Sequence, residues 1–247
     1  FASGDRVLSL LREAPAVTPV ENGRTFDFEH LTVNDLSFSY DGQAQVLQDV
    51  CMRADSGEIV GIVGESGCGK STLLKLLLRF WQKDRGTIAY NGIDVDETDT
   101  ASLLDNVTMV SQSTYLFDDT IEENLRIAKP DATREEMEAA CRMASVHECI
   151  LSLPEGYRTR AGTLGGNLSA GEKQRIGLAR AFLRGSGLIL LDEPTSNVDS
   201  INEGIILAAL KEQKRRKSII LVSHRESTMS IAERVYRVEK GRLYEQT

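Results

Sequence analysis

The stretch GESGCGKST, residues 64–72, has the residue types and spacing of a loop that holds phosphate groups. It fits the pattern G-x-x-x-x-G-K-S/T, between an expected strand and an expected helix. Glycines let the backbone curl so that successive N–H groups point at phosphate, and here they are Gly64, Gly67 and Gly69. Lys70 adds a positive charge for the β- and γ-phosphates of a nucleotide, and Ser71 offers a hydroxyl to Mg²⁺. We call residues 64–72 the phosphate loop.

A second candidate anion site lies in LSAGEKQR, residues 168–175. Ser169 and Glu172 form an S-x-x-E capping box, which predicts that a helix begins here. The free N–H groups and the positive dipole end of such a helix attract an anion, and Gly171 allows the backbone to approach a phosphate closely. The chain therefore holds two separate sequences that could bind phosphate, the phosphate loop and this helix start.

Two carboxylates and a histidine follow expected strands. Asp192 and Glu193 come at and after the end of LILLD, residues 188–192, and His224 follows SIILV, residues 218–222. In an open parallel sheet, ligands lie beyond the carboxyl ends of the strands, so these side chains should meet the phosphate loop. Asp192 would hold Mg²⁺, Glu193 would accept a proton from the attacking water, and His224 would bind the γ-phosphate. Alone, paired acids also mark turns and a single histidine is usually structural.

The elements that must position these residues can be read from the hydrophobic pattern. Continuous apolar or β-branched runs are typical of parallel strands buried on both faces, and they occur at Leu188 to Leu191 and Ser218 to Val222. A further short run rich in β-forming residues, Glu58 to Val63, ends at Gly64 and is also expected to be a strand. An amphipathic helix is expected over Asn202 to Arg216, and a mainly helical block over about residues 115–185. The alternation implies an open parallel sheet into which a helical block is inserted.

Local signals add four further expectations. Thr32 to Tyr40 alternates polar and apolar residues, as a strand does, and Leu73 to Trp81 is apolar around most of a helix surface, which predicts a buried helix. Thr133 and Glu136 form a T-x-x-E capping box. Cys141 falls on the apolar face of the helix that follows, so it is expected in the core.

Composition limits the class of protein. Of the 247 residues, 27% are charged and 41% are hydrophobic, with a net charge of −8, which argues against nucleic acid as the main partner. The one basic cluster, Lys211 to Lys217, is typical of a solvated helix end. No apolar run reaches the roughly 20 residues that cross a bilayer. The four cysteines lack paired spacing, so free thiols are expected.

Taken in order, these motifs resemble the nucleotide-binding domain of ATP-binding-cassette (ABC) transporters. The matching sequences are Tyr40, GESGCGKST, Gln112, LSAGEKQR, LILLDEP, SNVD and SHR, and they cover the chain from about Phe26 onward. The LSAGEKQR segment upstream of the LILLDEP strand separates this family from other phosphate-loop hydrolases. We call residues 168–175 the signature segment.

The resemblance implies ATP and Mg²⁺ as ligands and a role for each motif. Tyr40 would stack on adenine, Gln112 would sense Mg²⁺ and the γ-phosphate, and Ser196 to Asp199 would cross to the opposite subunit. Taken alone, Tyr40 could be a core aromatic and Asp199 a helix cap. The metal ligands would be Ser71, Gln112 and Asp192, and the catalytic residues Glu193, His224 and Lys70. The nucleotide-binding residues would be Tyr40, Gly64, Glu65, Ser66, Gly67, Cys68, Gly69, Lys70, Ser71, Thr72, Gln112, Ser169, Gly171 and Glu172.

The signature segment departs from the family pattern LSGGQ. Ala170 replaces a glycine, and Glu172 replaces a glutamine and adds negative charge near phosphate. Since either Glu or Gln completes the capping box and Gly171 is kept, the site should still work. In the family, the signature of one subunit closes over the ATP of the other, so two ATPs are sandwiched between two domains.

Further likenesses point to exporter-type transporters. DRVLSLLREAP, residues 5–15, resembles the segment that joins membrane helices to the cassette and is expected to form a short amphipathic helix. SQSTYLFDDTIEENL resembles the exporters' region around Gln112, and Tyr115, Leu116 and Phe117 are candidates for the patch that receives the membrane domain or for internal packing. Thr163 stands where exporters have a glutamate, so coupling to the membrane domain could differ in detail.

We therefore expect an α/β fold: a P-loop NTPase core with a mainly parallel sheet, an antiparallel β subdomain and an inserted α-helical subdomain at about 115–185. Residues 1–25 would be a linker from a missing membrane domain and residues 26–247 the cassette. The expected function is ATP hydrolysis that powers an exporter at the cytoplasmic face of the cell membrane. Its partners would be the transporter's transmembrane domains and a second nucleotide-binding domain. The alternatives are a weakly catalytic regulatory cassette of a heterodimer and a soluble, non-transport ABC ATPase.

Overall fold

The computed structural model describes residues 15, 17–42, 44–196, 198–214 and 216–246. The amphipathic helix expected over residues 5–15, and most of the expected linker, therefore lie outside the described residues. So does one residue of the Ser196 to Asp199 loop. In the described part of the chain, no helix is long and apolar enough to span a bilayer.

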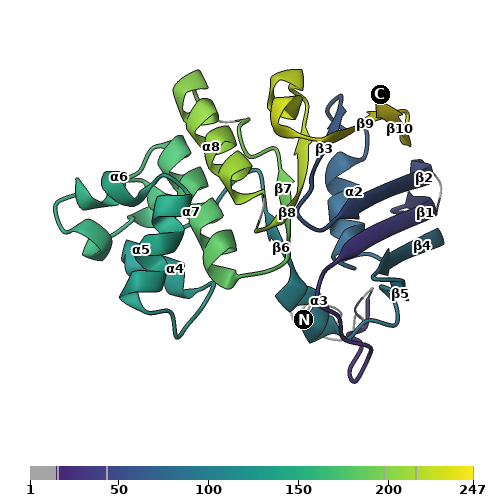
Figure 1. Cartoon of the computed structure of the whole chain (residues 1–247), viewed down its shortest axis with the longest axis horizontal. Coiled ribbons are helices and arrows are strands. Elements are labelled where there is room, and N and C mark those ends of the chain that lie inside the picture. The colour runs from purple at the N-terminus through teal and green to yellow at the C-terminus, as the bar shows by residue number, and fades with distance from the viewer. Residues whose placement is uncertain (1–14, 16, 43, 197, 215, 247) are drawn as a thin grey trace, which may run out of the picture.

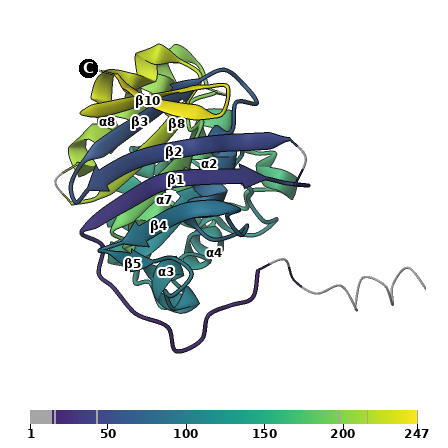
Figure 2. The same cartoon turned by 90° about the vertical axis from the view of Figure 1, so that its right-hand side faces the viewer.

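Two sheets organise the fold (Figure 1). The first is a four-stranded antiparallel sheet of order β2-β1-β4-β5. Its strands are β1 (His30–Ser39), β2 (Gln45–Asp55), β4 (Arg85–Tyr90) and β5 (Ile93–Asp94). In Figure 2 this sheet faces the viewer, with α7 and α4 behind it. The strand predicted at Thr32 to Tyr40 is confirmed as β1.

The second sheet has six strands in the order β10-β9-β3-β8-β7-β6, and only the pair β9-β10 is antiparallel. Its strands are β3 (Ile59–Gly64), β6 (Val107–Val110), β7 (Leu188–Asp192), β8 (Ser218–Ser223), β9 (Arg234–Glu239) and β10 (Arg242–Gln246). The strands predicted at Glu58 to Val63, Leu188 to Leu191 and Ser218 to Val222 are confirmed as β3, β7 and β8, and every residue of these three strands is buried.

The parallel sheet is the middle layer between two hydrophobic cores. Along β7, Leu188 and Leu190 point into a core shared with the antiparallel sheet and α2, whereas Ile189 and Leu191 point into a core shared with the helical block. This division follows from the two-residue period of side chains along a strand. Because both faces of β7 are covered, a ligand can reach this strand only at its carboxyl end.

Helices cover both faces of that sheet. They are α2 (Lys70–Leu77), α3 (Thr100–Asn106), α4 (Ile121–Arg126), α5 (Arg134–Met143), α6 (His147–Leu151), α7 (Ala170–Arg184) and α8 (Ser200–Gln213). Short 3-10 turns occur at Gly156–Arg158, Thr163–Gly165 and Glu226–Ile231. Figure 1 shows α4 to α7 gathered on the side opposite to the antiparallel sheet. The predicted α/β fold, with a mainly parallel sheet, an antiparallel β part and inserted helices, is confirmed.

Both predicted capping boxes are present. Thr133 and Glu136 exchange hydrogen bonds at the start of α5, and Ser169 and Glu172 do so at the start of α7. Cys141 is fully buried, as its helical spacing predicted. These boxes satisfy N–H groups that would otherwise lack a partner, so they fix where each helix begins.

Two predictions about helices were wrong in part. Leu73 to Trp81 does not stay helical, because α2 ends at Leu77 and Arg79 adopts a left-handed φ of 53°. Trp81 is consequently exposed rather than buried. The basic cluster at Lys211 to Lys217 is not all solvated, since Lys217 Nζ donates to the carbonyl oxygens of Gly185 and Ser186 at 2.6 and 2.8 Å. Burial lowers the pKa of Lys217.

Candidate nucleotide site

The phosphate loop follows β3 and leads directly into α2. Gly67 and Gly69 have φ of 79° and 106°, values that side chains with a Cβ rarely adopt, so these two glycines allow the turn. Gly64 serves a different purpose, because a Cβ there would lie 2.7 Å from the Val238 carbonyl oxygen. The chain thus curls back over the start of α2, whose first N–H groups are available to an anion.

Lys70 is held inside this loop. Its residue is only 4% exposed, and Nζ donates to the carbonyl oxygens of Gly64 at 2.9 Å and Glu65 at 2.7 Å. Cys68 is partly buried, with Sγ 3.8 Å from Nζ. A buried ammonium without a carboxylate partner favours an incoming anion, because phosphate oxygens can replace the neutral carbonyls as acceptors.

Ser71 and Asp192 form the part of the site that could hold a cation. Ser71 Oγ donates to Asp192 Oδ1 at 2.9 Å, and burial raises the pKa of Asp192 above its usual value while this bond opposes the rise. Among the described residues, no group of three or more acidic, His or Cys side chains could hold a metal by itself. One carboxylate and one hydroxyl fit Mg²⁺, which commonly takes its other ligands from phosphates and water.

Glu193 lies between two polar side chains. Its Oε2 accepts from Gln112 Nε2 at 3.3 Å and lies 3.0 Å from His224 Nδ1, and Gln112 Nε2 is also 3.3 Å from Ser196 Oγ. Glu193 has a left-handed φ of 49°, a conformation that costs energy outside glycine. The carboxylate is therefore fixed from both sides, beside the carboxyl end of β7.

A small cavity joins these groups. It has a volume of about 200 Å³ and is lined by Ser66, Gly67, Gly69, Lys70, Ser71, Thr72, Gln112 and Glu193. Its lining residues come from the phosphate loop, from the end of β7 and from the segment after β6. The structure thus brings the phosphate loop, Gln112 and Glu193 together at the edge predicted from the strand order.

Tyr40 reaches the same edge from the end of β1. Its hydroxyl lies 2.9 Å from Thr72 Oγ1, and its ring makes edge contacts with Phe38 and Trp81 at centroid distances of 4.9 and 5.1 Å. Tyr40 is 48% exposed, so it is not the core aromatic that its pattern alone allowed. Trp81 was missed as a neighbour of this aromatic group, since its spacing suggested only a helix face.

The signature segment is absent from the lining of this cavity. Ser169 and Ala170 are exposed at the start of α7, whereas the cavity is formed without Ser169, Gly171 or Glu172. The glycine at 171 has a reason inside the chain, because a Cβ there would lie 2.7 Å from Asn202 Cγ. The close approach that we attributed to a phosphate is therefore made at least in part by α8.

The region around Tyr115 to Phe117 divides into two kinds of side chain. Leu116 is fully buried in the helical block, so internal packing is the one of its two expected alternatives that holds. Tyr115 and Phe117 are 55% and 53% exposed and pack edge to face at 4.9 Å. Tyr115 and Phe117 are thus exposed on either side of the buried Leu116.

Comparison with known proteins identifies the family. The model of a family described as "ABC transporter" matches residues 47–196, more than half of the chain. The chain belongs to the ABC transporter family. The exporter-type nucleotide-binding domain inferred from the motifs is confirmed by this match and by the relatives below.

The relatives of this ABC domain include exporters and fused proteins. It is 53% identical over 244 residues to a probable ABC transporter ATP-binding/permease protein of Haemophilus influenzae, covering 98% of this chain and 44% of that protein. It is 38% identical to human ATP-binding cassette sub-family B member 6, over 99% of this chain and 29% of the relative. The structure of a bacterial Atm1-family ABC exporter with ATP bound matches with a TM-score of 0.90 at 32% identity, over 99% of this chain and 43% of that one. The chain thus spans less than half of these relatives.

Proposed function

We propose that this ABC domain binds and hydrolyses ATP with Mg²⁺, and that hydrolysis powers a membrane exporter through head-to-tail pairing with a second nucleotide-binding domain. The observation that supports it most is the position of Glu193. Its carboxylate lies between Gln112 and His224, next to a phosphate loop that already holds Lys70. A carboxylate fixed at this point can accept a proton from water that attacks a γ-phosphate.

Each neighbouring residue has a role in this proposal. Lys70 would exchange its carbonyl partners for the β- and γ-phosphates, and His224 would orient the γ-phosphate and the water. Ser71, Asp192 and Gln112 would hold Mg²⁺, which when bound neutralises charge that develops on the phosphates. Tyr40 would stack on adenine, because its exposed ring stands beside Thr72 at the mouth of the loop.

The pairing proposal rests on the separation of the two anion sites. The signature segment has free N–H groups and an exposed Ser169, yet it does not line the cavity at the phosphate loop. A second domain facing this one in the opposite direction would place its signature segment over this ATP. The expected partner is a second copy of this chain or a related domain, and not nucleic acid, given the net charge of −8.

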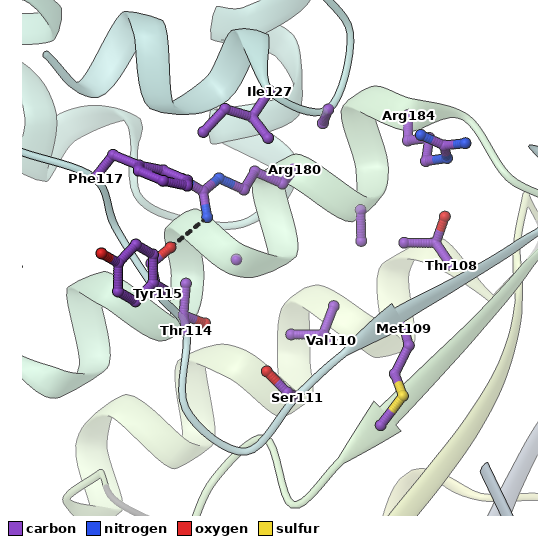
Figure 3. Close-up of a pocket in the computed structure, with 13 residues that line it drawn as sticks. Thr108, Met109, Val110, Ser111, Thr114, Tyr115, Phe117, Ile127, Arg180 and Arg184 are labelled. Atoms are coloured by element: carbon purple, nitrogen blue, oxygen red, sulfur yellow. Dashed lines mark hydrogen bonds between the residues drawn. The ribbon is translucent and has the colours of Figure 1, made fainter. Parts of the chain in front are cut away.

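The membrane domain would dock at a groove of about 460 Å³ beside α7 (Figure 3). Exposed Tyr115, Phe117 and Ile127 line it, and so does Arg180, whose Nη1 donates to the Tyr115 carbonyl oxygen at 2.6 Å. Burial lowers the pKa of Arg180 to about 10. We commit to the transporter's own membrane segments as occupant, because the Haemophilus relative is a fused ATP-binding/permease protein. In this proposal the chain would lie at the cytoplasmic face of the membrane.

The relatives disfavour the two alternatives, a soluble non-transport ATPase and a weakly catalytic cassette. Two relatives are described as ATP-binding/permease proteins, and the matching solved structure is that of an ABC exporter. A degenerate cassette would also be expected to lack Glu193 or His224, and both are present beside each other.

Replacing the proposed general base tests the activity. Glu193→Gln keeps the size of the side chain and should lower turnover roughly 100- to 10,000-fold, the usual contribution of a general base, with ATP binding preserved. Steady-state hydrolysis and equilibrium binding of ATP measure the two effects. Glu212→Gln, at an exposed position of α8, is the matched control. Near-normal hydrolysis by Glu193→Gln would remove Glu193 from this role.

A further inference from the structure

Asn202, in the first turn of α8, joins two parts of the chain that lie apart in sequence. Its Oδ1 accepts from Arg175 Nη1 in the signature segment, and its Nδ2 donates to Asp199 Oδ2 at 2.6 Å. The partners fix the orientation of the amide, because only an oxygen can face the guanidinium and only an N–H can face the carboxylate. The Asn202 side chain thus connects the guanidinium of Arg175 to the carboxylate of Asp199, with its oxygen toward the first and its N–H toward the second.

Arg175 depends on this link. The residue is 4% exposed, its Nη2 reaches Cys149 Sγ at 3.5 Å, and its Nε has no hydrogen-bond partner among the described residues. A buried cation that lacks partners is costly, so each remaining acceptor matters. Among those described, Asn202 Oδ1 is the one oxygen that accepts from this guanidinium.

The packing at Gly171 brings the same two helices together. Asn202 Cγ lies where a Cβ on Gly171 would come within 2.7 Å, so the first turn of α7 rests directly against Asn202. That turn also carries the Ser169 and Glu172 capping box. A shift of Asn202 would therefore be felt at the N–H groups of the signature segment.

Asp199 is held equally firmly at the other end of the link. Its Oδ1 accepts from the backbone N–H groups of Ile201 at 3.0 Å and Asn202 at 2.9 Å, while Oδ2 takes the Asn202 amide. The backbone N–H of Asn202, and then its side chain, hold the pKa of Asp199 below its usual value. Both carboxylate oxygens are thus tied to the start of α8.

We infer that Asn202 is a positioning residue that locks the start of the signature helix α7 to Asp199, so that two segments presented to the partner domain move as one unit. This inference rests on the proposed function, because it needs a second domain whose ATP meets the signature segment. It predicts that loss of Asn202 damages hydrolysis in the partner's phosphate loop and spares the loop of the chain that carries the change. A residue that only supports folding would damage both.

A pairing experiment separates the two cases. A test chain at low concentration is mixed with an excess of a Glu193→Gln chain, which cannot hydrolyse ATP but offers an intact signature segment. The first turnover of ATP by the test chain is then measured. In the reverse pairing, a wild-type test chain is mixed with an excess of the double variant Glu193→Gln, Asn202→Ala.

The expected result is asymmetric. An Asn202→Ala test chain with the Glu193→Gln excess should hydrolyse ATP at close to the wild-type rate, whereas the wild-type chain with the double variant should be about tenfold slower, the size of effect expected for the loss of one hydrogen bond to a charged group. Asn34→Ala, at an exposed position of β1, should change neither pairing. If Asn202→Ala does not fold, Asn202→Asp is used, because it keeps an oxygen for Arg175 but opposes the Asp199 carboxylate.

Equal losses in both pairings, or a loss only in the chain that carries the change, would overturn the inference. Failure of the proposed function has a different signature. In that case, the wild-type test chain would gain nothing from the Glu193→Gln excess, which would contradict the shared site itself before any Asn202 variant is compared.

Discussion

The phosphate loop and the signature segment share one physical device but differ in what surrounds it. Each presents N–H groups at the start of a helix, α2 in one case and α7 in the other. Beside the start of α2 lie the ammonium of Lys70, which belongs to the phosphate loop, and the carboxylates of Asp192 and Glu193 at the edge of the sheet. At the start of α7, Glu172 is part of the capping box with Ser169, and the guanidinium of Arg175 donates to Asn202 of α8.

In the proposed function, this difference explains why one chain by itself does not complete either site. The phosphate loop lies at the carboxyl ends of parallel strands, where side chains from distant sequence positions converge. The signature segment lies on the inserted helical block, away from those ends, as Figure 1 shows for α7 and α2. In the proposed function, a second chain brings the two environments together.

The largest difference between the two segments is expected in how substitutions in each of them affect ATP binding. Lys70→Ala should weaken binding by the isolated chain about 100-fold, because a charge-assisted contact to phosphate is lost. Ser169→Arg should leave this binding unchanged, since Ser169 is outside the cavity. Fluorescent-nucleotide titration at low protein concentration measures both variants. Equal weakening would show that the signature segment belongs to the binding site of its own chain.

The buried carboxylate of Asp192 gives a pH-dependent contrast. Burial raises its pKa in the folded chain, so the ionised form costs stability, and the free energy of unfolding falls as pH rises through that pKa. Without nucleotide and Mg²⁺, Asp192→Asn should therefore raise the melting temperature at neutral pH; each 1 kcal/mol gained would appear as about 2–4 °C in a chain of this size. This gain in melting temperature should shrink as the pH is lowered toward the ordinary pKa range of aspartate. Added Mg-ATP should stabilise only the wild type. A gain that grows as pH falls would contradict the assignment.

The two capping boxes form a matched pair that distinguishes stability from function. Thr133→Ala and Ser169→Ala each remove a cap, and each should cost about 1 kcal/mol of unfolding free energy. Only Ser169→Ala should also slow hydrolysis, because the Thr133 box lies at a helix that meets no phosphate in the proposal. Thermal unfolding and hydrolysis rates measured on the same samples check this. Similar hydrolysis by both variants would leave the signature cap with a structural role alone.

The smallest expected effect concerns the altered signature residue Glu172. Its Oε2 accepts from the Ser169 backbone N–H at 2.8 Å and hydroxyl at 2.9 Å, and a glutamine oxygen can keep both bonds. Glu172→Gln should therefore tighten ATP-driven dimerisation about two- to fivefold, since a negative charge leaves the helix start that faces phosphate. Sedimentation with the Glu193→Gln background measures it. Weaker dimerisation would show that the carboxylate is favourable there.

Much of the fold and of the candidate site could be predicted from local sequence. The strand that ends at Asp192 and the strand before His224 were evident because strands buried on both faces are continuously apolar. The caps at Thr133 and Ser169 were evident because their partners lie three residues away. The convergence of Gln112 with Glu193 followed from a resemblance and not from any pattern in its own segment.

What escaped prediction depends on contacts between distant segments. The packing of Gly171 against Asn202 joins positions in two different helices, and no periodicity in either helix announces it. The end of α2 before Trp81 is set by the left-handed Arg79, whose guanidinium reaches the carbonyl oxygens of Val95 and Thr98. Leu116 and Phe117 are adjacent and equally apolar, yet only the fold decides which one is buried.

The central claim, that this chain carries halves of two different sites, is tested most directly by complementation. Ser169→Arg and Glu193→Gln chains should each be nearly inactive alone. A Ser169→Arg chain mixed with an excess of Glu193→Gln chain should recover most of the wild-type rate for the first turnover of ATP, because its intact phosphate loop then meets an intact signature segment. A mixture no more active than the sum of its separate components would contradict the account.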